Sequence, residues 1–184
     1  MSATAQIPNG SSEPPNHRGA SQAPVHTISL YVHDRPGVLV RVAIVFARRG
    51  YNIESLVVSP SATEGYSRMT ITCSGDPATL QQIIRQLAKL VDVVHAIDHT
   101  GQAIIESEIA FIKLECGIQE RTEILQIAEQ FNARAVDYGA ENVVLRVYGS
   151  SEKLDALTLL LHPYRITELI RSGKIVMARG KAVT

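Results

Sequence analysis

Asp34-Arg35-Pro36-Gly37-Val38-Leu39 is the most informative part of the sequence, because it lies between a strand-like run, 27–33, and a helix-like run, 38–48. Pro36 fixes its own φ and favours an extended residue before it, and Gly37 allows the backbone to approach a ligand closely. The first unpaired N–H groups of the helix begin at the same point, and such a terminus suits a carboxylate. The stretch therefore predicts either a ligand-binding turn or a plain strand-to-helix turn shaped by Pro and Gly.

Hydrophobic spacing on both sides of this turn predicts a βαββαβ unit. Beyond the turn, one apolar face follows the i, i+3, i+4, i+7 spacing of a helix: Leu39, Val42, Ala43 and Phe46. Residues 53–59 and 67–73 are rich in β-forming side chains and flank a turn-forming stretch, which predicts an antiparallel hairpin. A second helix is expected to begin at Pro77 with Asp76 as its N-cap, and a closing strand is expected at 91–97.

A second unit of the same kind is predicted in the other half of the chain. Its expected elements are a strand at 109–114, a helix with the apolar face Ile124, Ile127, Ala128 and Phe131, strands near 133–138 and 142–148, a helix from Ser151 that stops before Pro163, and short strands at 166–170 and 174–178. The predicted fold class is therefore α+β, with two tandem ferredoxin-like βαββαβ domains.

Domain boundaries follow from composition and from the repeat. Residues 1–25 are rich in Ser, Ala, Pro, Asn and Gln without periodicity, and they are expected to be a disordered tail. The first domain is expected at 26–99 and the second at 107–184, with a linker at 100–106 where Gly101 breaks the pattern. Only the first domain contains the Asp-Arg-Pro-Gly turn, so the two domains are expected to have different roles.

Composition argues against several classes of protein. The 184 residues carry 18 Lys and Arg against 18 Asp and Glu, so the basic surface typical of a nucleic-acid-binding protein is not expected. No run approaches the roughly 20 apolar residues of a membrane span. Cys73 and Cys116 lie far apart in apolar segments, which predicts buried free thiols in a reducing compartment. We therefore expect a cytoplasmic protein with neither a nucleic-acid nor a membrane partner.

A metal site is one alternative, built from Asp92, His95, Asp98 and His99. Strand alternation places the two Asp side chains on one face and the two His side chains on the other, so solvated residues at a strand end are the simpler interpretation. No Ser-His-Asp or Cys-His arrangement can be argued from the spacing. We predict neither a catalytic residue nor a metal ligand in this chain.

Two further alternatives concern phosphate and RNA. Arg35 and Asn52 could hold an anion and a water on a ferredoxin-like fold, although Pro36 removes a backbone donor that such a site needs. RNA binding on the sheet requires stacking aromatics, and Tyr31 is more simply interpreted as a half-buried strand residue. The basic residues on the polar side of the first helix are expected to be solvated: Arg41, Arg48 and Arg49.

Several motifs, occurring in order, resemble those of a known family. They are Asp34 to Leu39, Arg49-Gly50-Tyr51-Asn52-Ile53-Glu54-Ser55-Leu56, Ser67-Arg68-Met69-Thr70-Ile71, Lys89-Leu90-Val91-Asp92-Val93, Lys153-Leu154-Asp155-Ala156, and Arg171-Ser172-Gly173 ahead of Ala178-Arg179-Gly180. The first domain resembles the ACT domain, an amino-acid-sensing module. From about residue 26 to about residue 180, the chain resembles the regulatory, or small, subunits of acetolactate synthase, also called acetohydroxyacid synthase. Asp34 departs from the pattern, since many members have Asn there.

This resemblance implies a regulatory subunit without an active site of its own. The implied partner is the thiamine-diphosphate-dependent catalytic (large) subunit, which would be activated and made sensitive to feedback inhibition by valine or another branched-chain amino acid. Thiamine diphosphate, Mg and FAD are expected only in that subunit, and no cofactor is expected in this chain. A homodimer through the ACT domain is also implied. The rival readings are a free-standing ACT-type amino-acid sensor for another partner and a small phosphate-handling enzyme.

The predicted effector site comprises six residues: Asp34, Gly37, Val38, Leu39, Asn52 and Ile53. Backbone N–H groups at Gly37 and Val38 are expected to bind the carboxylate of the amino acid, and Asp34 its ammonium group. The Asn52 side chain of a neighbouring protomer is expected to complete the polar shell. Leu39 and Ile53 are expected to form the apolar wall that selects a branched side chain.

Overall fold

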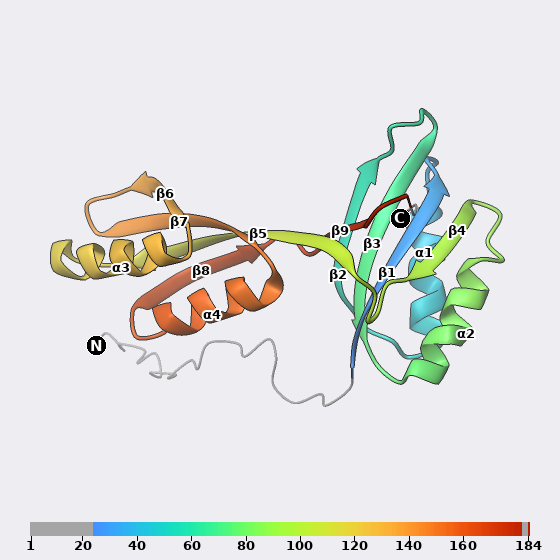
Figure 1. The fold of residues 1–184 in the computed structure, drawn as a ribbon, viewed down its shortest axis with the longest axis horizontal. Coiled ribbons are helices and arrows are strands. Elements are labelled where there is room, and N and C mark those ends of the chain that lie inside the picture. The colour runs from blue at the N-terminus through green and yellow to red at the C-terminus, as the bar shows by residue number, and fades with distance from the viewer. Residues whose placement is uncertain (1–23, 182–183) are drawn as a thin grey trace, which may run out of the picture.

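The computed structural model describes residues 24–181 and residue 184, and it places the elements in two successive groups (Figure 1). The first group is β1 (Val25–His33), α1 (Val38–Arg48), β2 (Ile53–Pro60), β3 (Tyr66–Ser74), α2 (Pro77–Leu87) and β4 (Val93–Asp98). The second group is β5 (Ile104–Glu115), α3 (Ile118–Gln130), β6 (Arg134–Tyr138), β7 (Asn142–Gly149), α4 (Ser151–Leu161), β8 (Arg165–Arg171) and β9 (Ile175–Ala178). The α+β fold class with two ferredoxin-like units is confirmed.

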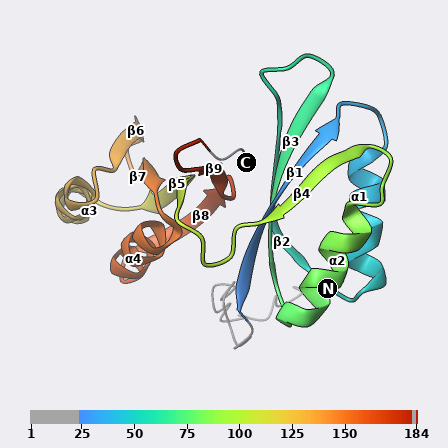
Figure 2. The ribbon, with the colours of Figure 1, turned by 45° about the vertical axis from the view of Figure 1, so that its right-hand side comes forward.

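Each domain is an antiparallel sheet with its helices packed on one face. The strand order is β2-β3-β1-β4 in the first domain and β6-β7-β5-β8 in the second. Figures 1 and 2 show α1 and α2 on the side of the first sheet that faces away from the second domain. Each domain has its own apolar core, the first around Ile28 and Phe46 and the second around Ile112 and Ile124. The helix-free face of the first sheet is therefore turned toward the second domain.

The helices of the first domain begin where local signals predict. Gly37 is the N-cap of α1 and has φ 84°, a left-handed conformation that a residue with a side chain rarely adopts. Asp76 caps α2, because its Oδ2 accepts a hydrogen bond of 2.8 Å from the Thr79 N–H, and Pro77 occupies the first turn. These hydrogen bonds from Thr79 lower the pKa of Asp76, since they stabilise its charged form.

The strand β5 departs most from the sequence-based prediction. A strand was expected at 109–114, whereas β5 begins at Ile104, because its first residues pair with β9 from Ile104 opposite Ala178 to Ser107 opposite Ile175. Residues 104–106, which were expected in the linker, are thus strand, and the β4–β5 connection is 99–103. The predicted tail, 1–25, lies outside the described residues except for its last two, and Val25 already belongs to β1.

The helix-free face of the first sheet is polar yet largely buried. Its central side chains are small hydroxyls, each between 3% and 9% exposed: Thr27, Ser29, Thr70 and Thr72. The segment that contains β9 and Thr184 lies on this side of the sheet (Figures 1 and 2). The carbonyl oxygen of Thr184 accepts a hydrogen bond from Arg68 and lies 3.2 Å from His95 Nε2. Part of the second domain thus contacts a face that would otherwise be open.

His99, at the end of this face, is buried, although it was expected to be solvated. Its Nε2 lies 2.7 Å from the Ser29 hydroxyl. Burial lowers the pKa of His99, because the charged imidazolium loses its hydration, and this effect outweighs a hydrogen bond with Gln102 and the charge of Asp98. The folded state therefore favours the neutral ring.

Both cysteines are free and buried, as predicted. Burial raises the pKa of Cys73 to about 12, and the charges of Glu54 and Asp98 act in the same direction. A thiol with this pKa is protonated at neutral pH, so Cys73 belongs to the core rather than to a nucleophilic site. In the described part of the chain, no helix is both long and apolar enough to cross a membrane.

One ion cluster, which we call the Arg171 cluster, joins β5, β8 and α4. The Arg171 guanidinium donates to both carboxylate oxygens of Glu108, at 2.9 and 2.6 Å, and to Asp155 Oδ1 at 2.5 Å. The Ser151 hydroxyl donates to Glu108 at 3.0 Å. Burial opposes the charge of Arg171, but the hydrogen bonds to Glu108 and Asp155 prevail and raise its pKa. The cluster therefore links three elements of the second domain through charged hydrogen bonds.

Substituting Arg171 tests how much this cluster stabilises the fold. Arg171→Met should lower the free energy of unfolding by about 3 kcal/mol, because Glu108, with 7% of its side chain exposed, loses its main counter-ion. Urea unfolding measures the loss. Arg165→Met is the matched control: Arg165 pairs with Glu115 on the surface, and the cost should stay below about 1 kcal/mol. Equal losses of unfolding free energy in the two variants would contradict the larger contribution assigned to the Arg171 cluster.

The pKa of His99 predicts a pH dependence. The unfolded chain binds a proton at His99 more readily than the folded chain does, so stability rises with pH through this group. Its contribution should be complete above about pH 6.5, the unfolded value, and should be lost as the pH falls below it. Urea unfolding at neutral and mildly acidic pH should show a smaller difference in His99→Gln than in the parent chain. An undiminished difference would assign the pH dependence to other groups.

Candidate functional site

The turn before α1 offers backbone donors to a ligand. Gly37 has no side chain, and α1 has no side-chain cap, so the first N–H groups of the helix are not satisfied in this way. The Val38 N–H makes only a long contact of 3.4 Å with the Arg35 carbonyl. The Asp34 N–H donates to the Gly65 carbonyl at 2.9 Å, which ties the turn to the β2–β3 hairpin. This arrangement suits an anionic group at the start of α1.

Arg41 and Asp92 hold this turn in place, and pattern reasoning missed them. Arg41 Nε and Nη2 donate to Asp92 Oδ2 at 2.8 and 2.6 Å, and the Asp92 carbonyl accepts from the His33 N–H at 2.8 Å. A Cβ atom built on Gly37 would lie 3.1 Å from Arg41 Nη1. The guanidinium therefore covers the glycine and links it to the residue before β4.

The prediction that Asp92 is solvated is wrong, whereas Arg41 is exposed, as predicted, but is paired with Asp92. Asp92 is only 5% exposed, because the start of α1 faces the α2–β4 connection and the two charges meet there. A carboxylate inside the apolar run 91–94 is the sequence signal that pointed to a buried partner. No group of three or more His, Cys, Asp or Glu side chains is placed to hold a metal ion within the described residues.

A single chain does not bring all the predicted site residues together. Asp34 and Leu39 are exposed beside the turn, and Val38 is buried, so it offers only its N–H. Asn52 and Ile53 follow the other end of α1, about 16 Å along the helix axis for 11 residues. Ile53 also packs partly against the first core. Within one chain, the predicted site residues are therefore divided between the two ends of α1.

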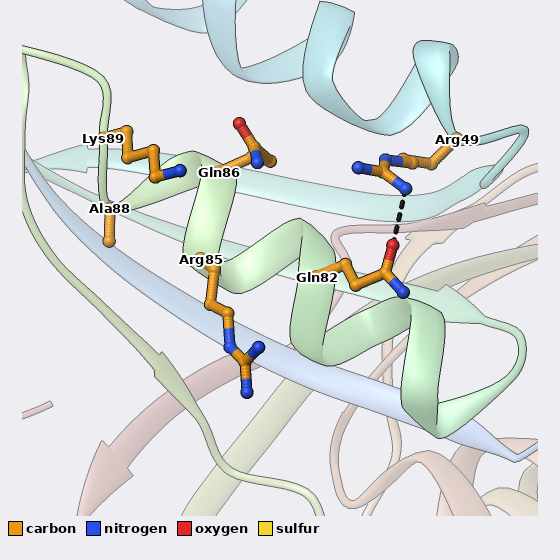
Figure 3. Close-up of a pocket in the computed structure, with 6 residues that line it drawn as sticks. All are labelled: Arg49, Gln82, Arg85, Gln86, Ala88 and Lys89. Carbon is orange, nitrogen blue, oxygen red and sulfur yellow. Dashed lines mark hydrogen bonds between the residues drawn. The ribbon is translucent and has the colours of Figure 1, made fainter.

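The same separation applies to the phosphate alternative. Arg35 precedes α1 and Asn52 follows it, so one chain does not place the two side chains on a common anion. An open hollow of about 550 Å³ lies elsewhere, on the helical layer of the first domain (Figure 3). It is lined by Arg49 after α1 and by residues of α2 and its end: Gln82, Arg85, Gln86, Ala88 and Lys89. None of the predicted site residues lines this hollow.

A row of rings on the helix-free face is a second feature that sequence reasoning missed. His33, Tyr66, Tyr31 and His95 follow one another across three strands, with neighbouring centroids 4.8 to 5.2 Å apart. The Arg68 guanidinium lies 5.1 Å from the Tyr31 centroid. Tyr31 is half-buried, as predicted, but strand register was needed to place the other rings beside it.

Comparison with known proteins identifies the family. The model of the AHAS small subunit-like ACT domain matches residues 28–95, and the model of the small subunit of acetolactate synthase matches residues 107–180. The acetolactate synthase small subunit of Mycolicibacterium smegmatis is 39% identical over 157 residues, which cover 85% of this chain and 92% of that protein. This chain belongs to the acetolactate synthase small-subunit family.

Other members of the small-subunit family also match most of this chain. The probable acetolactate synthase small subunit of Methanothermobacter thermautotrophicus is 43% identical over 84% of this chain and 93% of its own length. The crystal structure of the acetolactate synthase small subunit from Thermotoga maritima has a TM-score of 0.77 and 35% identity, and the match covers 86% of this chain and 99% of that one. The family recognised from the motifs is thus confirmed in sequence and in fold.

Proposed function

We propose that this chain is the non-catalytic regulatory subunit of an acetolactate synthase. It binds the thiamine-diphosphate-dependent catalytic subunit, raises its activity, and makes it sensitive to valine or another branched-chain amino acid in the synthesis of valine, isoleucine and leucine. The observation that carries the proposal is membership of the small-subunit family across both domains. By the same proposal, thiamine diphosphate, Mg and FAD belong to the catalytic subunit, and the complex is cytoplasmic.

The effector site of this proposal lies between two copies of the first domain. Its carboxylate subsite is the start of α1, where Gly37 keeps the backbone accessible and the helix dipole favours an anion. Asp34 is exposed beside it and attracts the ammonium group. Leu39, which is 40% exposed, supplies apolar surface, and Asn52 and Ile53 come from the second copy. The separation of these residues along α1 supports the homodimer, because one chain leaves the site incomplete.

The test of this function is reconstitution. The purified chain alone should show no turnover of pyruvate, and its addition to an acetolactate synthase catalytic subunit should increase pyruvate condensation. Valine should reverse the increase, and light scattering of the free chain should report a dimer. Stimulation without any response to amino acids would support binding to the catalytic subunit but contradict the proposed role as an amino-acid sensor. Phosphatase turnover by the chain alone would instead favour the phosphate-handling enzyme.

Substitutions in the turn test the effector site. Asp34→Ala should weaken valine binding by about 1.5 to 3 kcal/mol, the usual range for a hydrogen bond to a charged group. Gly37→Val should abolish binding, because φ 84° strains a branched residue and its side chain would meet Arg41. Calorimetric titration with valine measures both effects.

Two matched variants serve as controls for this titration. Asp137→Ala removes an exposed carboxylate from the second domain, and Gly101→Val places the same side chain at another left-handed glycine, with φ 71° and open space around it. Both should bind valine like the parent chain. Unaltered affinity in Asp34→Ala and Gly37→Val would place the effector elsewhere, even if the chain activates the catalytic subunit.

A further inference from the structure

The motif Arg171-Ser172-Gly173 lies where the two domains touch. Arg171 is fixed by the Arg171 cluster, which joins β5, β8 and α4. The next residue is bound to β5 twice: the Ser172 N–H donates to the Ile109 carbonyl at 3.0 Å, and the Ile109 N–H donates to Ser172 Oγ at 3.1 Å. The Ser172 hydroxyl also donates to the Gly173 carbonyl at 2.9 Å. The backbone leading to Gly173 is therefore held firmly by the second domain.

Gly173 itself rests on the first domain. It is buried, has φ 83°, and packs against the helix-free face of β2. A Cβ atom built on it would lie 3.0 Å from Ser55 Cβ, 3.1 Å from Ser55 Oγ and 3.2 Å from Val57 Cγ2. Such distances are tighter than ordinary van der Waals contact, so a side chain at position 173 would require Ser55 and Val57 to shift. We call this contact of Gly173 with Ser55 and Val57 the Gly173 seat.

The strand under this seat is the one that leads from the proposed effector site. β2 begins at Ile53, directly after Asn52, and among the residues that the structure describes it is an edge strand paired with β3 alone. Ser55 and Val57 point to the seat, whereas Leu56 between them packs toward the first core. A ligand held by Asn52 and Ile53 therefore acts on a strand that the second domain touches three to five residues further along.

We propose that the Gly173 seat carries the effector signal from β2 to the second domain, with Gly173 as a positioning residue. The inference rests on the proposed function and adds the route of its regulation. Closely packed atoms transmit a displacement of β2, because the Ser55 and Val57 side chains rest directly on the Gly173 backbone, which has no side chain that could rotate away. On the other side, the displacement reaches β5 through Ser172 and α4 through the Arg171 cluster. Effector binding and feedback thus become separable properties.

The test substitutes two glycines with nearly the same backbone conformation. Gly173→Ala and Gly180→Ala both place a Cβ at positive φ, 83° and 71°, but only the first meets neighbours within 4 Å. Full-length variants are compared with the parent chain in complex with the catalytic subunit. In Gly173→Ala, calorimetry should give a valine dissociation constant within about twofold of the parent, while the extent of inhibition at saturating valine should fall by at least about fivefold. Gly180→Ala should match the parent in both measurements.

A rescue variant keeps the test decisive if Gly173→Ala disturbs folding. Ser55→Gly removes the two closest atoms, so the double variant Gly173→Ala, Ser55→Gly should recover feedback to within about twofold of Ser55→Gly alone. Absence of recovery would overturn the seat as the route. Normal feedback in Gly173→Ala would also overturn it, as would an equal loss in Gly180→Ala.

The same measurements separate this inference from the proposed function. If the parent chain neither binds valine nor responds to it, the proposed effector function is wrong, and so is the inference that depends on it. If the parent chain and Gly173→Ala both bind valine and respond to it equally, only the inference about the Gly173 seat is wrong.

Discussion

The hydrogen-bonded ladder of β5 is the constraint on which the arrangement of the two domains depends. From Glu108 to Glu115 this strand pairs with β7, and over most of that length with β8, in the middle of the second sheet, while from Ile104 to Ser107 it pairs with β9. A strand paired along its length cannot bend freely, because each bend would break backbone hydrogen bonds. β5 therefore carries β9 as an extension of the second domain and keeps it beside the first sheet.

The first sheet accommodates this extension through the size of its side chains. Hydroxyl residues along its helix-free face leave a shallow, polar surface, and two of them are paired, because the Ser55 and Thr72 hydroxyl oxygens lie 2.5 Å apart. Buried polar groups are tolerated when they are paired in this way. The glycine at 173 approaches closely because neither side presents a bulky group. Large apolar side chains on this face would have favoured burial by a thicker layer, such as another pair of helices.

Local signals predicted where the helices of the first domain begin, whereas contacts between distant residues could not be predicted from them. α1 and α2 begin where Gly37, Asp76 and Pro77 indicate, because capping and proline geometry act within a few residues. The Arg41–Asp92 and Arg171–Glu108 pairs join residues 51 and 63 positions apart, and charge patterns alone do not specify such partners. The first residues of β5 show the same limit of local signals, since they form a strand by pairing with the distant β9. Half of the candidate site could be predicted from local signals, because its turn is local, whereas the role of Asn52 rests on the proposed second copy of the chain.

The polar face of the first sheet also bears on the order in which the protein is made. All strands of that sheet are present once the chain has reached Asp98, whereas β9 begins only at Ile175. Domains generally fold as units during synthesis, the N-terminal one first, so this sheet forms while its later cover is still absent. The serine and threonine side chains at the centre of this face are hydrated during that interval, whereas aliphatic side chains there would expose an aggregation-prone surface on a ribosome-bound chain. The hydroxyl residues thus suit both the nascent protein and the finished one.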